Sequence, residues 1–119
     1  MNTPERVDLA LYRGATFDTT VTWLDSDGDP VDLTGYTATF RAGRTRYGST
    51  TVQVLALATG GDGITLGGVA GTIAVTATAA QTRLIPPGAY RYQLEVTSAG
   101  GTVSRIQHGR ILVSPEVGP

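Results

Sequence analysis

Apolar and polar residues alternate one by one along several short segments of this chain, and this alternation restricts the possible folds more than any other feature. In residues 15–23, ATFDTTVTW, every second side chain from Phe17 to Trp23 falls on one face. A period of two is typical of a β-strand with one buried face. The same pattern occurs, more or less regularly, in residues 36–42, 51–57, 72–78, 89–96 and 103–113, and more weakly in 7–12.

Turn-forming sequences separate these segments, among them DSDGDP, TGGDG, LGGVAG, IPPG and SAGG. Short strands rich in Thr and Val, divided by Gly, Pro and Asp turns, indicate an antiparallel sandwich or barrel. We therefore predict an all-β fold, an immunoglobulin-like antiparallel β-sandwich of about seven to nine strands. Residues 60–80, rich in Gly and Ala, are interpreted as a loop followed by a thinly packed strand.

One short helix is expected near residues 78–84, TAAQTRL, where Thr78 can cap the first turn and Pro86 stops the last. Such a helix often crosses between the sheets of immunoglobulin-like sandwiches. Tyr90 or Tyr92 then follows as a candidate corner tyrosine, whose hydroxyl would hold the preceding loop. The alternative is an ordinary core aromatic with its hydroxyl at the rim.

The composition restricts the function as well as the fold. The 119 residues suit one domain, residues 1–119, with extended termini at 1–6 and 114–119. The absence of cysteine excludes disulfides and thiolate metal sites. A net charge of -1 and scattered arginines argue against a nucleic-acid surface, and no apolar run is long enough to span a membrane. The start of the chain does not resemble a signal peptide.

Asp25, Asp27 and Asp29 alternate like the first ligands of a calcium loop. The sixth position of such a loop would be Pro30 instead of Gly, and the twelfth would be Tyr36 instead of Glu. Asp and Gly also favour tight turns. We therefore interpret this stretch as a turn and keep the three aspartates only as a weak calcium candidate.

No motif indicates an enzyme. The single histidine, His108, lies in a predicted strand, and neither GxSxG nor a phosphate-binding glycine loop occurs. The glycine-rich stretch GGDGITLGG is not followed by a helix pattern, so it is interpreted as a loop. We expect no catalytic residues, no bound cofactor and no metal.

Longer motifs in both halves of the chain match a known group. The first half carries YRGATFDTTVTWLDSDGDPVDLTGYTATF, and the second carries GITLGGVAGTIAVTATAAQTRLIPPGAYRYQLEV followed by GRILVSPEV. From about residue 12 to residue 117 the chain resembles small bacteriophage virion proteins. It is similar to the N-terminal immunoglobulin-like domain of phage baseplate upper proteins, which attaches a receptor-binding module to the tail.

The resemblance implies a non-enzymatic virion protein that binds other virion proteins in the tail, baseplate or collar, in multiple symmetric copies. Because the sequence ends after this domain, we expect an adaptor or decoration. A capsid decoration protein and a carbohydrate-binding host-attachment module are the alternatives, with no nucleic acid or membrane as partner. The expected location is the virion, after synthesis in the host cytoplasm. Candidate interface residues lie in a turn and in the tail: Arg44, Arg46, Tyr47, Pro115 and Val117.

Overall fold

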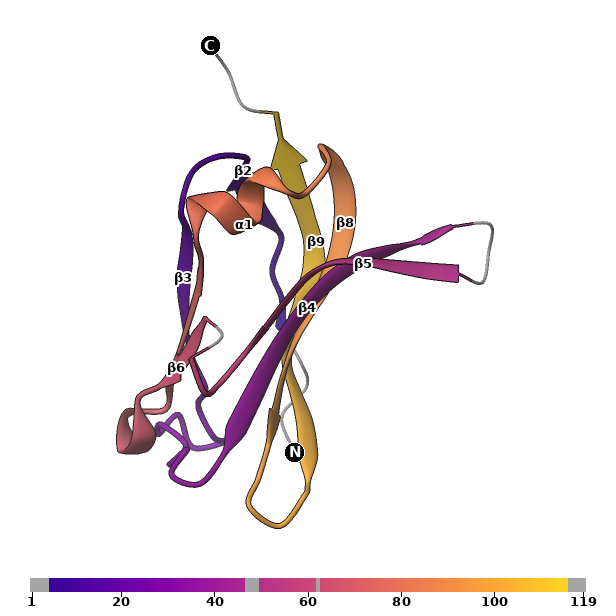
Figure 1. Cartoon of the computed structure of the whole chain (residues 1–119). Helices are drawn as coiled ribbons and strands as arrows, with labels where there is room; N and C mark the ends of the chain where they lie inside the picture. The colour runs from indigo at the N-terminus through magenta and orange to yellow at the C-terminus, as the bar shows by residue number, and fades with distance from the viewer. Residues whose placement is uncertain (1–4, 47–49, 62, 116–119) are drawn as a thin grey trace.

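A computed structural model describes residues 5–46, 50–61 and 63–115 and shows a mainly β protein built from two sheets (Figure 1). The larger sheet contains β1 (Glu5–Arg6), β2 (Leu9–Tyr12), β4 (Thr37–Arg46), β5 (Thr50–Ala58), β8 (Gly88–Thr97) and β9 (Val103–Ser114). The smaller sheet contains β3 (Phe17–Thr22), β6 (Ile64–Leu66) and β7 (Thr72–Ala77). The predicted strand number and the two-sheet arrangement agree with this structure.

The prediction of purely antiparallel pairing is wrong at one edge of the larger sheet. Both β1 and β2 run parallel to β9, with Glu5 opposite Gln107 and Leu9 opposite Ile111. The other pairs of strands are antiparallel, and the order across the larger sheet is β1–β9–β8–β4–β5, with β2 also beside β9. The period of two gives the faces of a strand but not its direction, so the alternation pattern could not show this.

The buried faces of the two sheets form the core. Alternation places Phe17 of β3, Ile73 and Val75 of β7, and Tyr90 and Tyr92 of β8 on the inward face. All five are buried, so the predicted faces of these strands are confirmed. The ring of Phe40 stacks on Tyr92 at 5.2 Å and meets Phe17 of the other sheet at 6.2 Å. Aromatic rings at these distances attract one another beyond the effect of burial alone.

The pairing of β4 with β5 contains a bulge after Ala42, where the register shifts. In residues 51–57 the alternation predicts that Val52, Val54 and Ala56 face inward. This is wrong for Ala56, which is exposed between the buried Leu55 and Leu57, whereas Val54 packs against the core. Beyond the bulge, the hairpin of β4 and β5 extends away from the body of the sandwich (Figure 1).

The predicted helix is confirmed as α1 (Ala79–Arg83). Thr78 caps it, because its hydroxyl accepts from the backbone N–H of Gln81 while the Gln81 side chain accepts from the N–H of Thr78. Thr82 is fully buried and donates to the carbonyl of Ala15, which fixes the helix against the chain before β3. The strand β6 and the 3-10 turn η1 (Gly68–Ala70) lie where the sequence indicated a loop.

The hydroxyl of Tyr90 donates to the carbonyl of Pro86 at 2.6 Å, four residues upstream. This bond holds the loop before β8, as the corner-tyrosine hypothesis expected for one of the two tyrosines. At the ends, Glu5 and Arg6 belong to a paired strand and Ser114 still belongs to β9. Within the described ranges, the structure contains no helix long and apolar enough for a membrane span.

Candidate functional site

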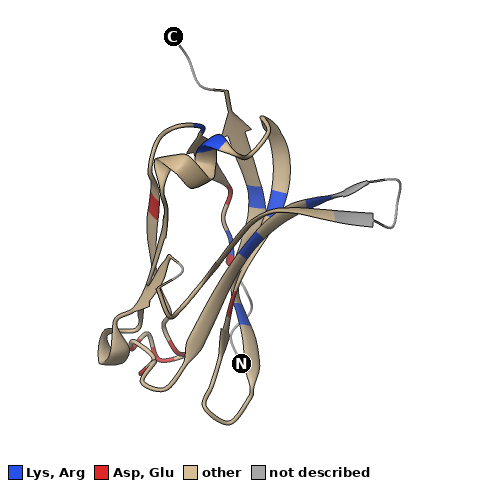
Figure 2. Ribbon diagram, viewed as in Figure 1, with Lys and Arg blue, Asp and Glu red and all other residues tan. Residues whose placement is uncertain are grey.

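The outer face of the larger sheet gathers arginines from three strands that are far apart in the sequence. Arg91 lies directly opposite Arg110, and Arg41 lies opposite Gln93, two residues along β8 from Arg91. All three arginines are exposed. Figure 2 shows the corresponding blue bands on β4, β8 and β9 at the centre of the sheet. We call Arg41, Arg91 and Arg110 the arginine face.

The arginine face has little compensating negative charge. Glu95 lies on the same side of the sheet but pairs with Arg105 at 3.8 Å. Asp8 accepts a hydrogen bond from the backbone N–H of Arg110 at 3.0 Å and lies near its charge. Among the residues that the structure describes, neither Arg41 nor Arg91 has an acidic partner. Like charges placed opposite one another on a sheet repel, so this arrangement slightly destabilises the isolated fold.

A shallow hollow of about 280 Å³ lies within this face, lined by Arg41 and Arg91 together with Gln53 and Gln93. Gly43 lies at the bulge and also lines the hollow. A Cβ at Gly43 would come within 2.5 Å of the carbonyl oxygen of Val52, so this position has room only for glycine. The hollow thus offers two guanidinium groups and two amides to an anionic group.

Residues 25–29, which we call the aspartate turn, form a closed turn, as their sequence predicts. One carboxylate oxygen of Asp25 accepts from the backbone N–H groups of Asp27 at 2.9 Å and Asp29 at 3.0 Å, and the N–H of Asp25 donates to the carbonyl of Asp29. The side chains of Asp27 and Asp29 are exposed. Over the described part of the chain, no three His, Asp or Glu side chains are arranged to hold a metal ion.

Of the predicted interface residues, the structure places Arg44 and Pro115. The guanidinium of Arg44 lies 5.2 Å from the centre of the Tyr90 ring and close to Gly88, which pairs with Val113. Arg44 therefore packs against the end of the sheet from which Pro115 continues, and Pro115 is exposed. Arg46 ends β4, but its side chain lies outside the described residues, as do Tyr47 and Val117.

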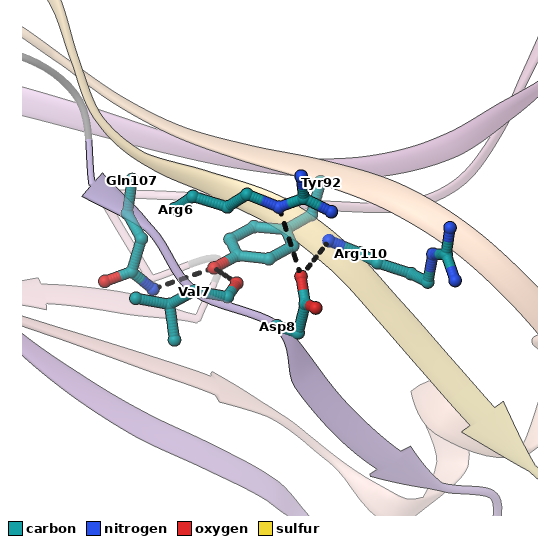
Figure 3. Close-up of polar contacts among 6 residues, drawn as sticks. All are labelled: Arg6, Val7, Asp8, Tyr92, Gln107 and Arg110. Atoms are coloured by element: carbon teal, nitrogen blue, oxygen red, sulfur yellow. Dashed lines mark hydrogen bonds and ion pairs between the residues drawn. The ribbon is translucent and has the colours of Figure 1, made fainter.

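A polar cluster joins the N-terminal segment to the sheet beneath the arginine face (Figure 3). The buried hydroxyl of Tyr92 donates to the carbonyl of Val7 and accepts from the side-chain amide of Gln107 at 2.9 Å. Burial raises the pKa of the Tyr92 hydroxyl, which keeps it a neutral donor. A Cβ at Gly109 would overlap the carbonyl of Val7, so glycine is required there too.

Asp8 completes this attachment from the solvent side (Figure 3). The hydrogen bond from the N–H of Arg110, followed by the charges of Arg6 and Arg110, lowers the pKa of Asp8 below its ordinary value. The carboxylate also lies 3.7 Å from the guanidinium of Arg6. These contacts hold β1 and β2 against β9 from both faces of the sheet.

A second depression, of about 850 Å³, opens between β3 and the first part of β9. Val21, Trp23 and Val31 line one wall, and Val103 to Ile106 line the other. Trp23 is half-buried, packs against the core and meets the ring of Tyr36 edge-on at 6.2 Å. The predicted inward orientation of Trp23 is therefore confirmed, although part of its side chain lines the depression.

Sequence reasoning missed the arginine face. Alternation alone indicated that Arg41 and Arg91 point outward, because each is next to an inward aromatic residue. The register that places Arg91 beside Arg110 and near Arg41 is a property of the assembled sheet. No family model and no curated protein matches the chain.

Replacing Tyr92 with Phe should lower the free energy of unfolding by about 1–3 kcal/mol, because the buried Gln107 amide and Val7 carbonyl both lose their partner. Urea denaturation measures this change. Tyr12→Phe is the matched control, because Tyr12 is 62% exposed, and we expect an effect within about 0.5 kcal/mol. Equal effects of the two substitutions would contradict the proposed attachment.

The pH dependence of stability should reveal Asp8. Because its pKa is lower in the folded than in the unfolded chain, its charge stabilises the fold above the ordinary aspartate pKa near 4. This contribution is lost as the pH falls through the lowered pKa of the folded state. The stability difference between the wild type and Asp8→Asn should therefore shrink with falling pH below about 4. A difference that stays constant down to pH ~2 in denaturant titrations would argue against this account.

Proposed function

We propose that this chain is a bacteriophage structural protein, a non-enzymatic β module that binds other virion proteins in a tail, baseplate or collar. The sequence motifs that resemble phage virion proteins suggest the context. The single structural observation that best supports a binding role is the free edge of the larger sheet at β5.

The strand β5 is an edge strand, since it pairs with β4 along one side, and on its other side the described residues form a single bridge, between Ala58 and Gly63. Its sequence, TTVQVLALA, contains no charged residue and no proline. Edge strands of soluble proteins normally carry such residues because they prevent pairing with other chains. An uncharged edge of this length can accept a strand from a neighbour, with affinity from main-chain hydrogen bonds.

We propose further that the sandwich is immunoglobulin-like. Two features support this: the short helix α1 that precedes β8, and the bond from the Tyr90 hydroxyl to the carbonyl of Pro86. The latter resembles the tyrosine corner of immunoglobulin-like domains, where a hydroxyl holds the backbone a few residues upstream. The parallel pairing of β1 and β2 with β9 is an addition at one edge.

The role in the virion predicts that the chain is present in purified particles and that Ala56→Lys reduces its incorporation at least about tenfold. Ala56 is exposed on β5, and a lysine there would oppose strand addition. Quantitative mass spectrometry of particles assembled with each variant measures the incorporation.

The matched control is Gln93→Lys on the interior strand β8. Gln93 lies opposite Arg41 on one side and Ala56 lies opposite Arg41 on the other, so both variants add the same charge beside Arg41. This variant should be incorporated like the wild type. Absence of the wild-type chain from particles would disprove the virion role. Normal incorporation of Ala56→Lys would disprove the use of the β5 edge. The close alternative is a decoration role on the capsid. Mass spectrometry of separated heads and tails distinguishes it from a tail role, because it shows which of the two contains the chain.

The depression of about 850 Å³ beside Trp23 favours carbohydrate binding as a second candidate, since one aromatic ring among polar side chains can bind a sugar. We expect any glycan-array binding by the isolated chain to be abolished by Thr102→Trp, which would place a bulky ring at the rim of the depression. Binding that survives this substitution, or no binding at all, would remove the carbohydrate candidate.

A further inference from the structure

We propose that copies of this chain bind one another head to tail, with the aspartate turn of one copy on the arginine face of the next. The partner of the arginine face is then a second copy of the same chain. Each copy carries two charged groups, and neither group has an oppositely charged partner among the residues that the structure describes. The proposed contact does not require the role in the virion.

The first group is the pair Arg41 and Arg91, which flank the hollow of about 280 Å³. In the described ranges neither has an acidic partner. On this side of the sheet, Glu95 pairs with Arg105, and Asp8 pairs with Arg6 and accepts from the backbone N–H of Arg110. A guanidinium binds a carboxylate with two parallel hydrogen bonds, and the amides of Gln53 and Gln93 add further donors. The hollow therefore suits a carboxylate side chain on a protruding loop.

The second group is the pair Asp27 and Asp29. The carboxylate of Asp25 is used inside the turn, where it accepts from both backbone N–H groups, and that of Asp32 accepts from Thr34. Within residues 5–46, 50–61 and 63–115, the carboxylates of Asp27 and Asp29 form no ion pair. Because the turn is closed by its own hydrogen bonds, presenting these two carboxylates to a partner costs little conformational entropy.

The two groups cannot meet within one molecule. The turn follows β3 of the smaller sheet, whereas the arginines point outward from the larger sheet, so the core lies between them. In Figure 2 the red of the turn lies at the lower left, away from the blue bands on β4, β8 and β9. Different surfaces of two copies would therefore meet, which is a heterologous contact that forms a ring or a filament.

Each ion pair in such a contact is exposed and individually weak. The near-neutral net charge of -1 means that two copies do not repel one another strongly at long range. In a ring or on a repeating scaffold the same contact recurs many times, and avidity then compensates for a weak single contact. In solution we expect a salt-sensitive association in the range of about 1 mM.

Two complementary variants isolate one such contact. Asp27→Asn with Asp29→Asn removes the turn charges and leaves the arginine face intact, whereas Arg41→Gln with Arg91→Gln does the reverse. Neither variant can self-associate through the proposed contact, but a mixture forms one contact and stops at a 1:1 pair. All four substitutions are at exposed positions, and NMR spectra of the free variants verify their folding.

The experiment is an NMR titration of the labelled turn variant with the unlabelled arginine variant. We expect saturable shifts around Arg41, Arg91 and Gln93, and their loss at about 0.5 M salt, where the screening length falls to about 4 Å. Labelling the arginine variant instead should move the shifts to residues 25–29. A chain with all four substitutions is the control ligand and should cause no shifts.

Absence of shifts, shifts elsewhere, or equal shifts with the control ligand would overturn the proposal. Inorganic phosphate is titrated in parallel. If phosphate shifts the arginine face while the arginine variant does not, the face binds small anions and the contact between copies is wrong. A chain missing from particles would disprove the virion role and leave this titration unaffected, so the two proposals fail separately.

Discussion

The stacking of Phe40 on Tyr92 is the interaction on which the rest of this structure depends. Phe40 also contacts Phe17 of the smaller sheet, so one ring joins the two layers. Through its hydroxyl, Tyr92 continues the connection to Val7 and Gln107 and thereby holds the N-terminal strands. A chain of direct contacts thus runs from the smaller sheet, through the core, to the parallel edge of the larger sheet.

The same stacking fixes what the molecule presents outside. Arg41 follows Phe40 and Arg91 precedes Tyr92, so the register that brings the two rings together also brings the two arginines together on the opposite face. The cost of their repulsion is small beside the burial of two aromatic side chains, each worth about 1.5–3 kcal/mol. Core packing can therefore hold like charges together on the surface of a single chain. An anionic partner that binds there would neutralise them.

Much of the architecture could be predicted from residue patterns. The alternation in β3, β7 and β8 gave their buried faces, and Thr78 gave the start of α1. These features are local, because a strand face and a helix cap depend on neighbours within a few residues. The aspartate turn was predictable for the same reason, since Asp25 bonds to backbone groups two and four residues away.

Features that depend on pairing between distant segments could not be predicted. The parallel direction of β1 and β2, the bulge after Ala42, and the strand β6 all arise from registers between strands. The arginine face belongs to this group, because Arg41, Arg91 and Arg110 lie on three strands and appeared scattered in the sequence. Arg44 and Pro115 were predicted as interface residues from their residue type and their position in a turn or tail. Neither property tells which residues lie beside them in the fold.

The separation of charge has a consequence for how such a module can be used. In most small proteins acidic and basic side chains are interspersed, so that neighbouring charges compensate one another. In the described part of the chain, Arg105 with Glu95 and Arg6 with Asp8 follow that rule, whereas Arg41, Arg91, Asp27 and Asp29 have no such partner. The uncompensated charges lie on two surfaces of opposite sign, separated by the core. Two such surfaces would make a head-to-tail contact, because each copy offers one basic surface and one acidic surface. The uncharged strand β5 has no such sign, so the strand addition proposed there would depend on main-chain hydrogen bonds, and the two surfaces would serve different partners.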